Sequence, residues 1–146
     1  MTIALGVPSL LLFCVCAGFI GLYFAMPEAD RRLAPDVDST PPSEIVVVSA
    51  DNLFREFVAS ESEARQAYFR RVVEVSGTVR EADEFFGIYF VTFENDLDRE
   101  TSVICQFSPE YKHQARAIRP GDSITVRGRC AGWISNVSLE DCRLSN

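Results

Sequence analysis

The sequence predicts a mainly β protein, a five-stranded barrel preceded by one or two short helices and by an N-terminal transmembrane helix. Three observations predict this organisation. The chain begins with a long apolar run, apolar residues at helical spacing follow near its middle, and after Arg71 apolar and polar residues alternate with a period of two. We therefore expect an anchor over residues 1–26, a flexible linker over 27–43 and the barrel domain over 44–146.

The predicted anchor contains no charged residue between Ile3 and Met26, and Pro27 follows it. Roughly 20 apolar residues are enough for a helix to span the hydrocarbon core of a bilayer. The alternative is a buried helix of a soluble protein, but such a helix is rarely apolar on all sides over this length. A single-pass attachment to the cell membrane is therefore the preferred interpretation.

The membrane orientation and the processing of this segment stay open. The sequence has no positively charged start and no small residue before Cys14 or Cys16, which favours an uncleaved anchor over a cleaved signal or a lipoprotein anchor. Arg31 and Arg32 favour a cytoplasmic C-terminal side. The cysteines of the barrel favour an extracytoplasmic domain, and we expect that location.

The linker is rich in Pro, Asp and Ser, which is typical of a solvated tether. An extended entry over residues 44–50 precedes two short helices, whose N-caps are Ser49 or Asp51 and Ser60 or Ser62. The apolar stripes expected to cover an end of the barrel are Leu53, Phe54, Phe57 and Val58 in the first helix and Ala64, Ala67 and Tyr68 in the second.

The first strand has Val73, Val75, Gly77 and Val79 on one face, with a glycine where a barrel must bend. Further strands are expected over residues 87–93, 101–107, 123–130 and 137–144. An acidic loop over 94–100 separates the second strand from the third, and a short helix over 109–118 separates the third from the fourth. Three strands, a helix and then a hairpin is the order of the OB fold.

Two motifs near the C-terminus, Gly128-Arg129-Cys130 and Leu139-Glu140-Asp141-Cys142, are the most specific part of a wider similarity. With the pieces 48–53, 68–79, 103–107 and 120–130, they show that the stretch from Val48 to Cys142 resembles the tRNA_anti-like family of OB-fold domains, which is common in small bacterial exported proteins. The resemblance implies the OB fold behind an export signal or anchor. It does not imply a function, because one fold serves many functions.

Cys130 and Cys142 are candidates for a structural disulfide. If residues 135–137 form the turn, the two cysteines lie opposite each other on the last two strands, with a bulge near residues 140–141. The alternative is two unrelated buried thiols. Cys105 is expected to be a buried free cysteine, and His113 lacks a catalytic or metal-binding partner motif.

The candidate ligand-binding residues are Phe86, Tyr89, Arg127, Arg129 and Trp133. OB folds bind ligands on the face of their second and third strands, between two hairpin loops, and aromatic side chains there can stack on bases. Arg127, Arg129 and Arg143 alternate along the last two strands and are expected to form an outward basic stripe. The alternative is that most of the aromatic side chains fill the core.

The composition and the absence of catalytic motifs make some classes of function less favoured than others. The chain carries 21 acidic and 14 basic residues, a formal net charge of −7, which disfavours nucleic acid as a partner. No nucleophile–base motif, phosphate loop or metal-ligand spacing is present, so we expect no catalysis, cofactor or metal. The leading interpretation is a membrane-anchored binding module at the cell envelope for a protein, glycan or small ligand. The alternatives are a single-stranded nucleic-acid binder and a structural envelope protein.

Overall fold

The computed structural model describes residues 34–146, and a compact unit extends from Pro35 to Asn146. The predicted anchor lies outside the described residues. Within residues 34–146 no helix is long and apolar enough to cross a membrane. The elements are η1 (Pro42–Glu44), β1 (Val46–Ser49), α2 (Ala50–Ala59), α3 (Glu61–Tyr68), β2 (Val72–Phe85), β3 (Ile88–Phe93), β4 (Val103–Phe107), η2 (Pro109–Tyr111), α4 (Lys112–Ala117), β5 (Ser123–Ile134) and β6 (Asn136–Leu144).

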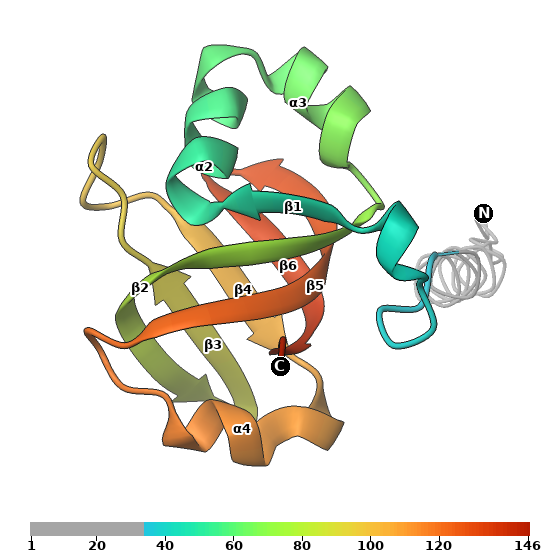
Figure 1. Ribbon diagram of the computed structural model, residues 1–146. Helices are drawn as coiled ribbons and strands as arrows, with labels where there is room; N and C mark the ends of the chain where they lie inside the picture. Colours follow the sequence, from blue (N-terminus) through green and yellow to red (C-terminus); the bar gives the residue numbers. More distant parts are fainter. Residues whose placement is uncertain (1–33) are drawn as a thin grey trace, which may run out of the picture. The chain divides into compact units, whose positions relative to one another are not determined.

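Five of the strands form a closed barrel (Figure 1). Their order is β2-β3-β4-β6-β5, and pairing between β2 and β5 closes the ring. The short strand β1 adds to the side of β2 in parallel. The prediction of a five-stranded OB barrel with short helices is confirmed, while β2 and β5 are longer than the sequence pattern indicates.

Strand β2 organises the barrel because it pairs with three other strands. Residues 72–78 pair with β5, and the register with β3 shifts between Val79 and Glu81, where β2 turns from one neighbour to the other. Gly77 lies at the start of this bend. A Cβ atom there would lie 2.9 Å from the ring of Phe93 and 3.0 Å from the Cβ of Ala50, so the tight packing requires glycine.

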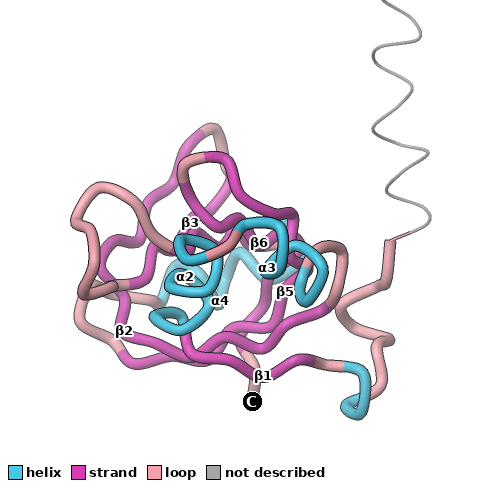
Figure 2. The backbone as a smooth tube through the Cα atoms, turned by 90° about the horizontal axis from the view of Figure 1, so that it is seen from above, coloured by secondary structure: helices cyan, strands magenta, loops and turns pink. Residues whose placement is uncertain are grey.

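Of the two N-cap candidates predicted for each helix, Ser49 rather than Asp51 caps α2, and Ser60 rather than Ser62 caps α3. The Ser49 hydroxyl accepts from the backbone N–H of Asn52 at 3.2 Å, and Ser60 caps α3 in the same way. Figure 2 looks down on the ring of strands and shows α2 and α3 over it. The buried side chains of α2 include Leu53, Phe54 and Phe57. Val58 does not extend this stripe as predicted, because it is 53% exposed, and Ala67 of α3 is exposed as well.

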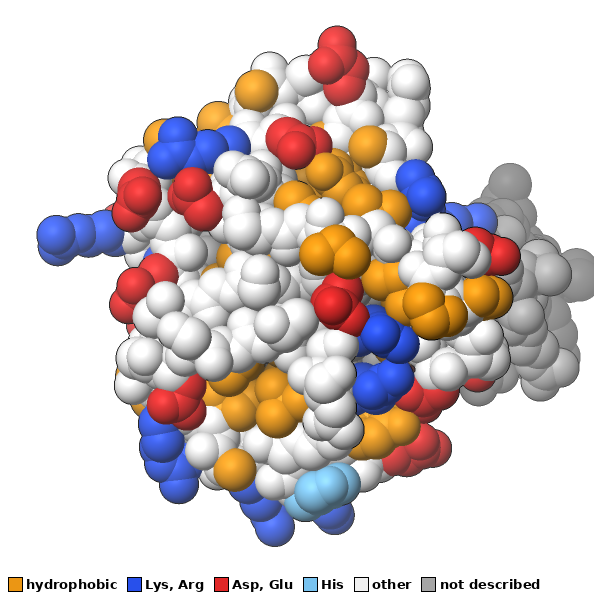
Figure 3. Space-filling model, viewed as in Figure 1, with side chains coloured by type: hydrophobic (Ala, Val, Ile, Leu, Met, Phe, Trp, Pro, Cys, Tyr) orange, Lys and Arg blue, Asp and Glu red, His pale blue; other side chains and the backbone are white. Residues whose placement is uncertain are grey.

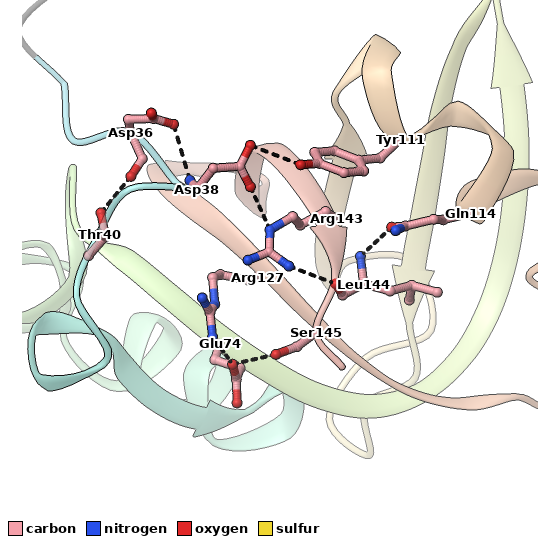
Figure 4. A network of polar contacts seen from close by, with 10 residues as sticks. All are labelled: Asp36, Asp38, Thr40, Glu74, Tyr111, Gln114, Arg127, Arg143, Leu144 and Ser145. Carbon is pink, nitrogen blue, oxygen red and sulfur yellow. Dashed lines mark hydrogen bonds and ion pairs between the residues drawn. The ribbon is translucent and has the colours of Figure 1, made fainter.

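Residues 35–43 contact the barrel, although the sequence predicts a solvated tether over 27–43. The side chain of Val37 is buried. The Asp38 carboxylate lies 2.6 Å from Nε of Arg143 on β6 and accepts from the Tyr111 hydroxyl at 3.0 Å (Figure 4). This part of the segment is therefore fixed to the domain by an ion pair and by apolar burial.

The predicted register of the last hairpin is wrong. Cys130 pairs with Leu139 rather than with Cys142, and both thiols are free and buried. The register shifts twice, between Arg127 and Arg129 and between Cys130 and Gly132, and Asp141 adopts a left-handed φ of 53°. The cause is the position of the turn, because Ile134 pairs with Asn136 across Ser135. The pair Arg127–Arg143 then places Cys142 beside Gly128, two residues from Cys130.

Candidate ligand-binding face

The outer surface of β3 and β4 corresponds to the face on which OB domains bind their ligands. Val91 and Phe93 of β3 and Val103 and Cys105 of β4 are buried in the barrel. Because successive side chains of a strand point to opposite faces, the residues between them point outward. Strand register joins these outward residues in two rows, Glu81–Thr92–Ile104–Ser138 and Asp83–Phe90–Gln106.

An exposed apolar tip extends this face at the β2–β3 hairpin. Phe86 and Gly87 both have positive φ, 50° and 78°, as a two-residue type I′ turn requires. The turn leaves Phe86 89% exposed and Phe85 66% exposed, with their rings in edge contact at 4.4 Å. Ile88, paired with Phe85, is 37% exposed. The tip therefore presents an aromatic pair held by a turn with a defined geometry.

Apolar and acidic side chains alternate across the face. Phe90 and Ile104 are partly exposed, and they connect the hairpin tip with the centre of the face. Exposed carboxylates border them at Glu81 and Asp83, each directly paired with an outward residue of β3. This composition favours a partner with apolar groups and positive charge, and it opposes a phosphate backbone.

The sequence did not single out Phe90, Ile104 and Gln106 for this face. Residues 88–93 are apolar at nearly every position, so periodicity alone does not show which of them point outward. The structure shows which of these residues point outward, because Val91 and Phe93 are buried inside the barrel. The location was predictable from the OB order, but the side chains that form it were not.

The predicted basic stripe is wrong, because carboxylates engage its arginines. Arg127 lies 3.0 Å from Glu74, and the Arg129 side chain, 9% exposed, lies 2.7 Å from Asp141 and 3.2 Å from Glu140. Figure 3 shows basic atoms beside acidic ones on the face of β2 and β5, without a single-sign patch. These arginines hold strands together rather than offering free positive charge to a ligand.

Two predicted ligand-binding aromatics are also engaged within the fold. Nε of Arg116 on α4 donates to the Tyr89 hydroxyl at 2.6 Å, and its guanidinium lies over the ring at 5.6 Å. Trp133 stacks on Phe57 and packs against Phe54, with ring centroids 6.2 and 5.6 Å apart. Of the five predicted ligand residues, Phe86 is the one that the structure leaves fully presented to solvent.

The face is shallow. A depression of about 260 Å³ lies between the β2–β3 hairpin and α4, with Asp83, Tyr89, Phe90, Arg116 and Arg119 among the residues that line it. Sites for small molecules are typically enclosed and about 300–1,000 Å³ in volume. Within residues 34–146 no cluster of His, Cys, Asp or Glu is arranged to hold a metal ion. The shape favours a macromolecular surface over an enclosed small molecule.

The C-terminus is fixed to β2 through Glu74 (Figure 4). The Glu74 carboxylate accepts hydrogen bonds from the Ser145 hydroxyl and from Arg127, and these bonds lower the pKa of Glu74 below its ordinary value of 4.5. A lowered pKa means that the folded state favours the ionised carboxylate. The contribution to stability is therefore complete above the unfolded pKa and is lost as the pH falls through the folded pKa.

We expect Glu74→Gln to lower the free energy of unfolding at pH 7 by about 1 kcal/mol. The same variant should lose less stability than the wild type when the pH falls below about 4.5. Urea unfolding at several pH values between 3 and 7 measures both effects. Glu81→Gln, which removes an exposed carboxylate from the same strand, is the control. Parallel pH profiles for wild type and Glu74→Gln would contradict the role of Glu74.

Comparison with solved structures confirms the fold. A protein of Klebsiella pneumoniae described as a "putative nucleic acid-binding lipoprotein" matches with a TM-score of 0.58 and 16% identity, over 77% of this chain and 99% of its own. The Stn1–Ten1 complex of S. pombe matches with a TM-score of 0.41 and 17% identity, over 51% of this chain and 58% of its own. At these identities the likeness concerns the fold. A search of curated proteins finds no significant match.

The family is shown by sequence. A family model described as tRNA_anti-like matches residues 2–143, nearly the whole chain. The predicted resemblance, which rested on the pieces between Val48 and Cys142, is confirmed over a longer stretch. The chain belongs to the tRNA_anti-like family of OB-fold proteins.

Proposed function

We propose that this protein is a membrane-anchored binding module of the cell envelope that docks another protein on the outer face of β3 and β4. The observation that carries the proposal is that the apolar side chains of the hairpin tip, Phe90 and Ile104 lie on one outward face, bordered by Glu81 and Asp83. Apolar side chains and basic groups of a protein surface complement such a face. The N-terminal apolar run and the lipoprotein description of the Klebsiella relative support a place at the envelope.

The proposal assigns binding rather than chemistry to the domain. Protein interfaces are enriched in aromatic residues at their centre and have charged groups at their rim, and this face has the same arrangement. Phe85 and Phe86 are exposed at the hairpin tip and pack only against each other among the ring contacts of the described residues, which marks them as contact residues. The shallow relief of the face agrees with a protein surface as the ligand.

Photocrosslinking in the native host tests this proposal. A photoreactive phenylalanine analogue at position 90 is expected to give a defined adduct that protease destroys and nuclease leaves intact. The analogue at Val58, exposed on α2, is the matched control and should not give that adduct. Adding Asp83→Lys should reduce the yield at position 90 roughly fivefold, because it reverses the charge at the rim. An adduct equally abundant at both positions, or unaffected by Asp83→Lys, would refute the proposed face.

A second function, binding of single-stranded nucleic acid, is favoured by one observation. Phe90 lies on the outer surface of the OB face, where aromatic side chains stack on bases in single-strand binders. The bordering carboxylates and the engaged arginines oppose it. It predicts that labelled single-stranded DNA or RNA binds the full chain with an affinity that falls as salt rises and falls again in Phe90→Ala. Fluorescence anisotropy decides this, and we expect no binding at about 150 mM salt.

A further inference from the structure

Two buried cysteines share the interior of the barrel. Cys105 lies on β4 and Cys142 on β6, neighbouring parallel strands in which Cys105 pairs with Leu139 and Phe107 with Cys142. Neither side chain is exposed to solvent. The Cys105 thiol acts on the Cys142 thiol and contributes to the raised pKa of Cys142. The two side chains therefore face the same interior from neighbouring strands, although their residues are far apart in the chain.

A bulge in β6 produces this arrangement. Leu139 points into the barrel, so strict alternation would direct Asp141 inward and Cys142 outward. The left-handed φ of 53° at Asp141 and the register shift opposite Cys105 and Phe107 return Cys142 to the interior instead. Gly128 on β5 leaves room for it, because a Cβ atom there would lie only 2.5 Å from the Cys142 sulfur.

The third thiol of the barrel, Cys130, is held elsewhere. Its backbone exchanges hydrogen bonds with the segment after α3, from Cys130 N to Arg71 O at 2.9 Å and from Arg70 N to Cys130 O at 2.8 Å. Its strand partner is Leu139. Burial raises the pKa of Cys130 to about 11, so its thiol is weakly nucleophilic. Among the three cysteines of residues 34–146, the arrangement joins Cys105 with Cys142 and separates Cys130.

We propose that Cys105 and Cys142 form a disulfide bond when the chain folds in an oxidising compartment, and that Cys130 remains a free thiol. That the domain folds in an oxidising, extracytoplasmic compartment rests on the proposed function. The choice of the two cysteines that pair rests on the structure of the barrel alone. The bond would join β4 to β6 and enclose α4 and the β5–β6 hairpin in one covalent loop. It differs from the Cys130–Cys142 pairing that the sequence predicts.

The chemistry is thiol–disulfide exchange. The two thiols lose two protons and two electrons, and the acceptor is the disulfide of a thiol oxidoreductase or of glutathione, which is reduced to two thiols. One cysteine first forms a mixed disulfide with the acceptor, and the other then displaces the acceptor's thiol. Burial, with the Cys105 thiol adjacent, raises the pKa of Cys142 well above its ordinary value. Exchange therefore takes place before the barrel closes, and the finished bond is shielded afterwards.

Peptide mapping of the full chain tests the pairing directly. The purified chain in detergent is refolded in a mixture of reduced and oxidised glutathione, free thiols are alkylated, and trypsin is added. Cys105 then lies in the peptide 100–112, Cys130 and Cys142 both lie in the peptide 130–143, and Cys14 and Cys16 lie in the separate peptide 1–31. A second cleavage after Glu140 separates Cys142 from Cys130.

The expected result is a disulfide-linked pair of fragments that contain Cys105 and Cys142, with Cys130 alkylated. An internal link within 130–143, a link from Cys105 to Cys130, or alkylation of all three thiols would overturn the proposal. Cys130→Ala is the matched variant and should retain the linked fragments, whereas Cys142→Ala should lose them. If Cys142→Ala does not fold, the peptide maps of the wild type and of Cys130→Ala still show which cysteines are linked.

Two further measurements separate this proposal from the proposed function. Chain that is reduced with dithiothreitol in denaturant and then refolded should have a Tm roughly 10 °C or more below that of the oxidised chain, because the bond closes a long loop, and the same should hold in Cys130→Ala. An unchanged Tm would contradict the bond. A linked pair in the refolded protein but reduced thiols in chain isolated from the host would support the pairing and refute the oxidising location.

Discussion

Replacing Phe54 with alanine is expected to lower the free energy of unfolding by about 3–5 kcal/mol. Phe54 is 1% exposed and lies on α2, where it contacts Trp133 of β5. Alanine would remove most of a buried ring and leave a cavity that the surrounding strands fill only in part. Small domains have about 5–15 kcal/mol of stability in total, so the variant would lose a large share of it.

Urea unfolding and the fluorescence of Trp133, the one tryptophan of the chain, measure this effect together. Trp133 should become more exposed to water in Phe54→Ala, which shifts its emission to longer wavelength in the native state. Val58→Ala is the matched control, because Val58 is on the same helix and 53% exposed. A loss of stability as large in Val58→Ala as in Phe54→Ala would mean that α2 does not pack on the barrel by the side chains described.

The contact of Trp133 with α2 explains why a loop aromatic need not be a ligand contact. A ring at the tip of a hairpin is a plausible stacking platform when only the sequence is known. In the fold, Phe54 and Phe57 of α2 occupy one side of this ring. The helices that precede the barrel thereby cover the aromatic group of the last hairpin, whereas the aromatic side chains Phe85 and Phe86 of the β2–β3 hairpin stay exposed.

Local sequence signals predicted the elements well. Alternation of Val73, Val75 and Val79 predicted the central strand, and Ser49 and Ser60 predicted the helix starts, because capping and side-chain periodicity depend on neighbouring residues. The order of strands and helix then predicted the OB barrel. The strand and the helix starts use information within about ten residues of the chain, and the barrel uses the order of the elements along the domain.

The candidate site was predicted less well, because its features depend on residues far apart in sequence. The carboxylate that engages Arg127 belongs to Glu74, 53 positions away, so the arginine seemed free. The sequence did indicate the bulge near Asp141. The partner of Cys142 depends instead on where the hairpin turns, and the pairing of Ile134 with Asn136 moves Cys142 away from Cys130.

Gly128→Ala is expected to lower the free energy of unfolding by about 1–3 kcal/mol through overpacking. The new methyl group would lie 2.5 Å from the Cys142 sulfur and 3.2 Å from the backbone carbonyl oxygen of Glu140. The Cys142 sulfur can move only by turning its side chain within a packed interior, and the carbonyl contact can be relieved only by moving β6 away from β5. Urea unfolding measures the loss, and Ser123→Ala, at an exposed position of the same strand, is the control.

The double variant Gly128→Ala/Cys142→Ala separates the two contacts. Removing the sulfur atom relieves the shorter contact, so the double variant should recover part of the stability relative to Cys142→Ala alone. The carbonyl contact remains and should keep the recovery incomplete. If Gly128→Ala costs the same in the presence and absence of the sulfur, Cys142 does not lie over Gly128. The bulge that brings Cys142 to Cys105 would then have to be placed differently in β6.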